Sequence, residues 1–204
     1  MELEGPQDDV VERTALAYER GAALYAEGGL KPRTMEREMM LFIGHLSPGA
    51  KVLDAGCGPG RDLKEMQALG FEVTGVDNSQ ELLDMVPKEI VTLKADLRSI
   101  PLPQASFEGV WAIASLLHLP RVEMKTALSE MRRLLVSGGH LMVSIKEGKG
   151  ENWVADKGME ERFFTYYEGE ELDQLLKGAG FEVEYSESKP AGVATWLTRI
   201  AVAR

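Results

Sequence analysis

The chain has 204 residues, of which 44% are hydrophobic and 27% charged, with a formal net charge of −10. These values predict one globular domain with a single core, and they exclude a fibrous or disordered chain. The negative charge disfavours extended binding of nucleic acid, because a phosphate backbone would be repelled. No apolar run is long enough to cross a bilayer, and the acidic N-terminus lacks the basic start and apolar stretch of a secretory signal. We therefore expect a cytoplasmic protein with no membrane partner.

Cysteine and histidine are too sparse in the sequence to predict a metal centre. The one cysteine, Cys57, has no partner for an internal disulfide. The three histidines, His45, His118 and His140, are scattered and do not have the spacing of a zinc site. No metal is expected.

Two helical stretches precede the first predicted strand. They cover about residues 8–26 and 33–46, and the sequence EGGLKP separates them. Because they come before the sheet, residues 1–46 are predicted to form a helical lid over the site. Tyr18 and Tyr25 lie seven residues apart and so share one helical face. They are expected either to face the site or to pack in the core.

From residue 47 onward, short apolar runs alternate with helical patterns. The expected strands are 51–55, 72–76, 90–94, 108–113 and 140–145, and the expected helices are 61–69, 80–85 and 121–135. Such alternation predicts an α/β fold with a mainly parallel sheet and helices on both faces. After a further helix from residue 168, the runs FEVEYSES and VATWLTRIAVAR flank a short KPAG turn and predict a C-terminal antiparallel hairpin. Residues 47–204 would thus form the core of a single domain spanning 1–204.

The stretch KVLDAGCGPG, residues 51–60, carries the clearest sign of a binding site. Gly56, Gly58 and Gly60 follow a short strand and leave backbone N–H groups accessible to a ligand that approaches the main chain. The stretch lacks the Lys and Ser/Thr of a P-loop, and its last glycine comes one residue too early for a dinucleotide fingerprint. Asp54 would repel a pyrophosphate and favour a cationic ligand. The alternative is a plain tight turn, which would need only one glycine.

The segment VLDAGCGPG resembles the first motif of the class I S-adenosylmethionine-dependent methyltransferases, and the resemblance extends over most of the chain. It implies a Rossmann-like sheet of seven strands in the order 3-2-1-4-5-7-6, with the last strand antiparallel. The implied cofactor is S-adenosylmethionine, which leaves as S-adenosylhomocysteine. By this resemblance Asp77 would hold both ribose hydroxyls, Asp96 would accept from the adenine amino group, and the Leu97 N–H would donate to the adenine ring. The cofactor-binding positions that it implies are Asp54, Gly56, Cys57, Gly58, Gly60, Asp77, Asn78, Asp96, Leu97 and Ala114.

The acidic positions also have structural alternatives. Asp77, Asn78 and Ser79 form a helix-start pattern, with Glu81 at capping-box spacing from Asn78. Asp96 would also suit an exposed loop. The order of three acids after three successive strands favours cofactor binding. Cys57 has no adjacent basic partner, so small size explains it better than nucleophilic chemistry does.

Methyl transfer from a sulfonium is an in-line displacement with a neutral leaving group, so alignment and exclusion of water are its main needs. A hydroxyl or ammonium acceptor would benefit from a general base, and His118 in SLLHLP is the candidate. The alternative for His118 is that it packs the loop. Tyr25 is the second candidate catalytic residue, beside the methyl group. The aromatic residues of RFFTYYEGEEL are expected in an acceptor pocket or in the core.

The loop after the fourth expected strand narrows the acceptor class. It reads AIASLLHL, whereas family members that methylate amino groups of nucleobases or glutamine resemble Asn-Pro-Pro-Tyr or Asp-Pro-Pro-Tyr there. A small-molecule acceptor is therefore expected. Two other functions stay open, a non-catalytic S-adenosylmethionine-binding module and a nicotinamide-dependent oxidoreductase. The sequence leaves the acceptor, the methylated atom and the oligomeric state undetermined.

Overall fold

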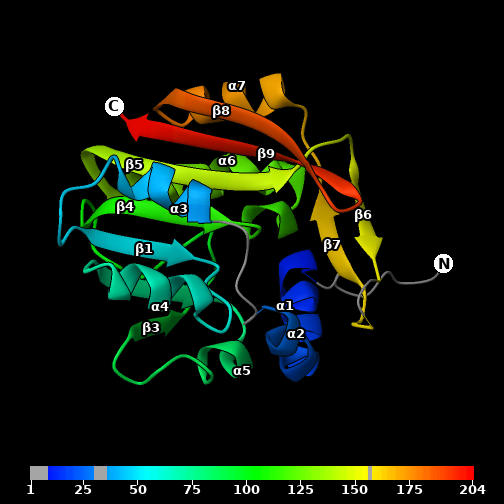
Figure 1. Ribbon diagram of the computed structural model, residues 1–204. Helices are drawn as coiled ribbons and strands as arrows, with labels where there is room; N and C mark the ends of the chain where they lie inside the picture. The colour runs from blue at the N-terminus through cyan, green and yellow to red at the C-terminus, as the bar shows by residue number, and fades with distance from the viewer. Residues whose placement is uncertain (1–8, 30–35, 156–157) are drawn as a thin grey trace.

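The computed structural model describes residues 9–29, 36–155 and 158–204 (Figure 1). Its main element is a seven-stranded sheet in the order β3-β2-β1-β4-β5-β9-β8. The five strands from β3 to β5 are parallel, and β9 pairs antiparallel with both β5 and β8. The predicted sheet order and the C-terminal antiparallel hairpin are confirmed. The strands of this sheet are β1 (Lys51–Ala55), β2 (Glu72–Asp77), β3 (Val91–Lys94), β4 (Phe107–Ile113), β5 (Leu135–Lys146), β8 (Phe181–Ala191) and β9 (Ala194–Ala203).

Helices cover both faces of the sheet because its central strands are apolar on both sides. In β1 and β4 almost every residue is buried, as expected for parallel strands between two helical layers. Apolar residues of α6 and α7 pack on one face, and apolar residues of α3 and α4 pack on the other. These helices are α3 (Glu36–Ile43), α4 (Arg61–Ala68), α6 (Arg121–Leu134) and α7 (Gly169–Gly178), and the short α5 (Gln80–Leu83) follows β2.

The N-terminal helices divide between two roles. Helices α1 (Val10–Arg20) and α2 (Ala22–Gly29) stand beside the carboxyl ends of the parallel strands (Figure 1). Helix α3 instead inserts Met39 and Phe42 into the core, 2% and 0% exposed, where the Phe42 ring lies 5.3 Å from that of Trp111. The predicted lid of residues 1–46 is therefore corrected, because α3 buries its apolar face against the sheet. The expected start at residue 8, the EGGLKP break from residue 30 and the start at 33 lie outside the described residues.

An insertion between β5 and α7 forms a separate ribbon of two antiparallel strands, β6 (Glu151–Val154) and β7 (Arg162–Thr165). Strand β7 packs against α1 and against η1 (Leu116–His118). Phe163, Phe164 and Tyr167 are 7%, 4% and 1% exposed, so this aromatic group belongs mainly to the core. Among the described residues, no helix is both long enough and apolar enough to span a bilayer.

Candidate active site

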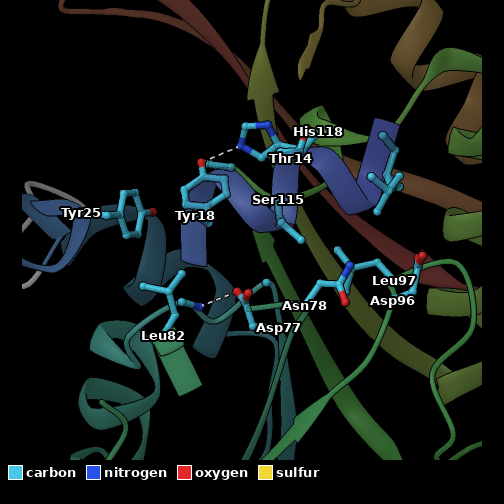
Figure 2. A pocket seen from close by; sticks show the side chains of 16 residues that line it. Thr14, Tyr18, Tyr25, Asp77, Asn78, Leu82, Asp96, Leu97, Ser115 and His118 are labelled. Atoms are coloured by element: carbon cyan, nitrogen blue, oxygen red, sulfur yellow. Dashed lines mark hydrogen bonds between the residues drawn. The ribbon is translucent and has the colours of Figure 1, made fainter. Parts of the chain in front are cut away.

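A cavity lies where the carboxyl ends of β1, β2 and β4 face helix α1 (Figure 2). This is the edge at which open α/β sheets bind ligands. Thr14 and Tyr18 line it from α1, and His118 lines it from η1. Seven of the ten positions predicted to bind the cofactor also line it, namely Gly56, Gly58, Asp77, Asn78, Asp96, Leu97 and Ala114.

A second cavity adjoins the first at the glycine loop. Asp54 and Cys57 line it, together with Arg61, Asp62 and Ile113. Both cavities share the residues at their junction, which are Gly56, Gly58 and Tyr25. The one remaining position of the ten, Gly60, lines neither of these two cavities.

A glycine is needed at each of the three positions of the loop for a different structural reason. Gly56 has φ +90°, and a Cβ there would lie 2.2 Å from the Cβ of Ser115, so no side chain fits. Gly58 has φ +52°, and a Cβ there would lie 3.6 Å from a ring carbon of Tyr25. Gly60 has φ +78° at the start of α4, where a Cβ would lie 2.9 Å from Val86. Two glycines thus border the cavities, and the third serves the turn.

Asp77, the last residue of β2, holds the glycine loop in place. Its Oδ2 accepts a hydrogen bond of 2.8 Å from the Gly58 N–H, and its Oδ1 accepts one of 2.9 Å from the Ser79 N–H. Burial raises the pKa of Asp77, and these backbone donors oppose the shift. The N-cap of α5 is Ser79, whose Oγ accepts from the Leu82 N–H at 3.3 Å, and not Asn78 as the capping-box spacing suggests. Asn78 lines the cavity instead.

Asp96 forms a close ion pair that the sequence did not indicate. Arg98 donates to its carboxylate from Nη2 at 2.6 Å and from its backbone N–H at 2.8 Å. The same Nη2 donates to Asp9 at 2.8 Å, and Asp9 caps α1 by accepting from the Val11 N–H. Arg98 thereby connects the loop after β3 to the start of α1 and holds the pKa of Asp9 below its usual value.

Both ring nitrogens of His118 form hydrogen bonds within the protein. Its Nδ1–H donates to the Phe163 carbonyl at 2.6 Å, so the neutral ring has a free lone pair on Nε2 only. That atom lies 2.8 Å from the Tyr18 hydroxyl, which donates to it (Figure 2). Burial lowers the pKa of His118 to about 3. A ring engaged in this way is a poor acceptor for a substrate proton, so the geometry favours the packing alternative.

Tyr18 is the polar group that His118 positions. Its hydroxyl also accepts a hydrogen bond of 3.2 Å from Nη1 of the buried Arg162. The Tyr18 ring meets the Tyr25 ring edge to face, with centroids 5.1 Å apart. Burial raises the pKa of Tyr18, which keeps the phenol neutral. Both tyrosines therefore face the site, and they also pack against each other.

Cys57 packs inside the loop rather than offering a nucleophile. Burial, reinforced by the charge of Asp54, raises the pKa of its thiol. A Cβ at Gly75 of β2 would lie 2.8 Å from the Cys57 Sγ, so the two residues are in tight contact. A small, protonated thiol agrees with the expectation that Cys57 is present for its size.

The chain is similar to known methyltransferases in sequence. Residues 53–143 match the family model described as a methyltransferase domain. An O-methyltransferase of Penicillium expansum is 28% identical over 155 residues, which are 68% of this chain and 55% of that protein. A malonyl-[acyl-carrier protein] O-methyltransferase of Serratia marcescens is 30% identical over 135 residues, 65% of this chain and 49% of that protein. The chain spans about half the length of the curated relatives it matches.

Solved structures share the fold over almost the whole chain. A Burkholderia thailandensis 1,6-didemethyltoxoflavin-N1-methyltransferase, solved with its substrate and S-adenosylhomocysteine, has a TM-score of 0.75 at 24% identity and covers 98% of this chain and 93% of its own. The [4+2]-cyclase SpnF has a TM-score of 0.77 at 19% identity, with 97% of each chain covered. At this identity the two structures support the fold. The methyltransferase-domain match over residues 53–143 and the strand order of the sheet together make the chain similar to the class I S-adenosylmethionine-dependent methyltransferases.

Proposed function

We propose that the protein is an enzyme that transfers the methyl group of S-adenosylmethionine to a small-molecule acceptor. The observation that carries the proposal is the pair of joined cavities at the carboxyl edge of the sheet. They meet at Gly56, which has no room for a side chain, and at Tyr25. A ligand with a nucleoside at one end and an amino acid at the other matches the chemistry of these two cavities.

The first cavity offers the groups that a nucleoside needs. The Asp77 carboxylate and Asn78 would hold the ribose hydroxyls, since each carboxylate oxygen can accept a second hydrogen bond beside the one from Gly58 or Ser79. Asp96 and the backbone of Leu97 would hold the adenine. All four residues line the same cavity.

The second cavity carries both signs of charge, which suits the zwitterion of an amino acid. Asp54 supplies negative charge for an ammonium group, and Arg61, which also pairs with Asp62 at 2.6 Å, supplies positive charge for a carboxylate. The bound cofactor supplies an electrophilic methyl group on a sulfonium. Tyr25, at the junction of the cavities, would border that sulfonium with its aromatic ring.

The chain's own residues would align the acceptor and exclude water. Helix α1 lines the first cavity, Tyr25 of α2 lies at the junction, and Tyr18 presents a hydroxyl whose orientation His118 and Arg162 fix. We assign His118 a positioning role through Tyr18 rather than direct proton abstraction, because both of its nitrogens are engaged. Transfer to a nucleophilic acceptor then needs alignment and desolvation more than it needs a base.

We propose that the methyl acceptor is a small molecule and not a nucleic acid, because the net charge of −10 would repel a phosphate backbone. It also includes a cytoplasmic location, supported by a lone buried cysteine without a disulfide. The alternative is an S-adenosylmethionine-binding protein without methyl transfer. It is favoured by one observation, that a neighbour of the same fold is described as a cyclase.

Two measurements test the proposal in sequence. S-adenosylhomocysteine, but not a nicotinamide dinucleotide, should raise the melting temperature of the protein by several degrees at about a hundred times its Kd. Labelled S-adenosylmethionine with metabolite extracts should then yield a labelled small molecule with wild-type protein and much less with Asp77→Asn. Binding of S-adenosylhomocysteine without any labelled product would favour the non-catalytic alternative. Stabilisation by the dinucleotide alone would overturn the proposal.

A further inference from the structure

We infer that the protein has a second ligand site, for a divalent transition metal such as Zn²⁺, formed by His45, His140 and Glu184. One potential ligand atom from each of these residues lies within 4.8 Å of the other two. The sequence predicted no metal because the histidines are scattered along the chain. The fold brings His45 and His140 together with the Glu184 carboxylate, so their separation in the sequence does not argue against a metal site.

Three separate segments of the chain supply the residues. His45 follows α3, whose apolar face is fixed on the sheet by Phe42. His140 belongs to β5, and Glu184 belongs to β8. These strands are not neighbours, because β9 lies between them.

A bulge in β8 accounts for the position of Glu184. Val183 pairs with Ala201 and Tyr185 pairs with Ile200, so Glu184 is the extra residue between two consecutive partners. Bulges of this kind turn a side chain away from its regular direction. Here the Glu184 Oε2 reaches the His140 Nε2 at 3.2 Å, across the intervening strand.

The distances fit a shared metal ion. Ligand atoms bound tetrahedrally at about 2.0–2.2 Å from Zn²⁺ lie about 3.3–3.6 Å from one another. The Glu184 Oε2 lies 3.2 Å from the His140 Nε2 and 3.7 Å from the His45 Nδ1. The two imidazole rings lie side by side, with centroids 4.7 Å apart and planes at 36°. Small side-chain rotations would bring all three atoms to the coordination distance of one ion.

The donor set selects the class of ion. Two imidazoles and one carboxylate are the ligands of known zinc sites that keep a fourth position for water. Mg²⁺ prefers oxygen ligands and octahedral geometry, so it should bind weakly here. The His45 and Glu184 side chains are 32% and 35% exposed, so an ion can reach the site from solvent.

The site is separate from the proposed cofactor site. None of its three residues lines either cofactor cavity. His140 pairs with Gly109 near the start of β4, whereas the cavity lies beyond the other end of that strand, at Ala114. A bound metal would tie α3 to β5 and β8, and so would stabilise the antiparallel edge of the sheet rather than take part in methyl transfer.

Calorimetric titration of the chelator-treated full chain with ZnCl₂ tests the inference, with MgCl₂ as the comparison ion. We expect saturable binding of one Zn²⁺ per chain, a higher melting temperature with Zn²⁺, and little effect of Mg²⁺. His45→Gln and Glu184→Gln should each weaken Zn²⁺ binding at least tenfold. The matched control is Glu182→Gln, because Glu182 lies on the same strand but pairs with Arg204 at 2.7 Å. It should bind Zn²⁺ as the wild type does.

Imidazole resonances in NMR spectra give a second readout that locates the ion. Zn²⁺ should shift the ring signals of His45 and His140 and leave those of His118 unchanged, since His118 is engaged by Tyr18 and Phe163. The inference would be overturned by an absence of saturable Zn²⁺ binding. It would also be overturned if Glu182→Gln weakened binding as much as Glu184→Gln, or if Zn²⁺ shifted only His118.

Discussion

The Asp77 carboxylate accepts the Gly58 N–H at 2.8 Å, and this bond fixes the end of β2 to the loop that follows β1. One side chain therefore both shapes the glycine loop and faces the cavity in which we place the ribose. Cofactor affinity and folding stability should depend on it together.

Asp77→Asn should weaken binding of S-adenosylhomocysteine by well over tenfold, because it removes charge-assisted hydrogen bonds of roughly 1.5–3 kcal/mol each. It should also lower the free energy of unfolding by about 1–3 kcal/mol, because one amide oxygen replaces two carboxylate oxygens that accept from Gly58 and Ser79. Calorimetry and urea unfolding measure the two effects. Glu65→Gln, on the exposed side of α4, is the control. Normal affinity in Asp77→Asn would contradict the ribose assignment.

Gly56→Ala should destabilise the protein more than Gly49→Ala does. Both glycines have positive φ, +90° and +76°, so both variants carry backbone strain of about 1–2 kcal/mol. Only at position 56 does the new Cβ meet another atom, the Ser115 Cβ at 2.2 Å, which adds about 1–3 kcal/mol. Urea unfolding compares the variants, and Gly56→Ala should also lose S-adenosylhomocysteine binding. Equal destabilisation of the two variants would show that the loop can move away from Ser115.

His118 should make the folded protein less stable in mild acid. Its pKa in the folded state is about 3, whereas the ordinary value is 6.5, so between these values only the unfolded chain binds the proton. The free energy of unfolding therefore falls as the pH is lowered through this range. In His118→Gln the slope against pH should be smaller by up to about 1.4 kcal/mol per pH unit, whatever the absolute stability of the variant. Identical slopes between pH 4 and 6 would show that His118 is accessible to protons in the folded state.

Helices α1 and α2 should exchange their amide hydrogens more slowly when S-adenosylhomocysteine is bound. Val11, Thr14 and Tyr18 of α1 and Tyr25 of α2 line the cofactor cavity, so a ligand there adds contacts to both helices. Helix α3 is the internal control, because it packs on the sheet and lines neither cofactor cavity. Hydrogen-exchange mass spectrometry resolves the three helices. Equal slowing in all three would indicate a global change rather than a lid.

The sequence predicted the sheet and the cluster of acids because both depend on local patterns. Apolar runs that end at glycine or at an acid define the strands, and parallel strands bring Asp77 and Asp96 to one edge. Helical periodicity shows that α3 has an apolar face but not which surface covers it, so α3 was wrongly included in the lid. The Arg98–Asp9 ion pair and the His45–His140 contact join residues distant in sequence, and no local pattern marks such pairs.

The path of the chain through the antiparallel edge affects how the protein can fold as it is synthesised. Strand β8 precedes β9 in the chain, yet β9 occupies the position next to β5 and separates it from β8. On the ribosome, β5 therefore keeps an open edge of unpaired N–H and C=O groups until β9 has left the exit tunnel. Strand β8 has no sheet partner before then, so the two strands complete the sheet in one late step.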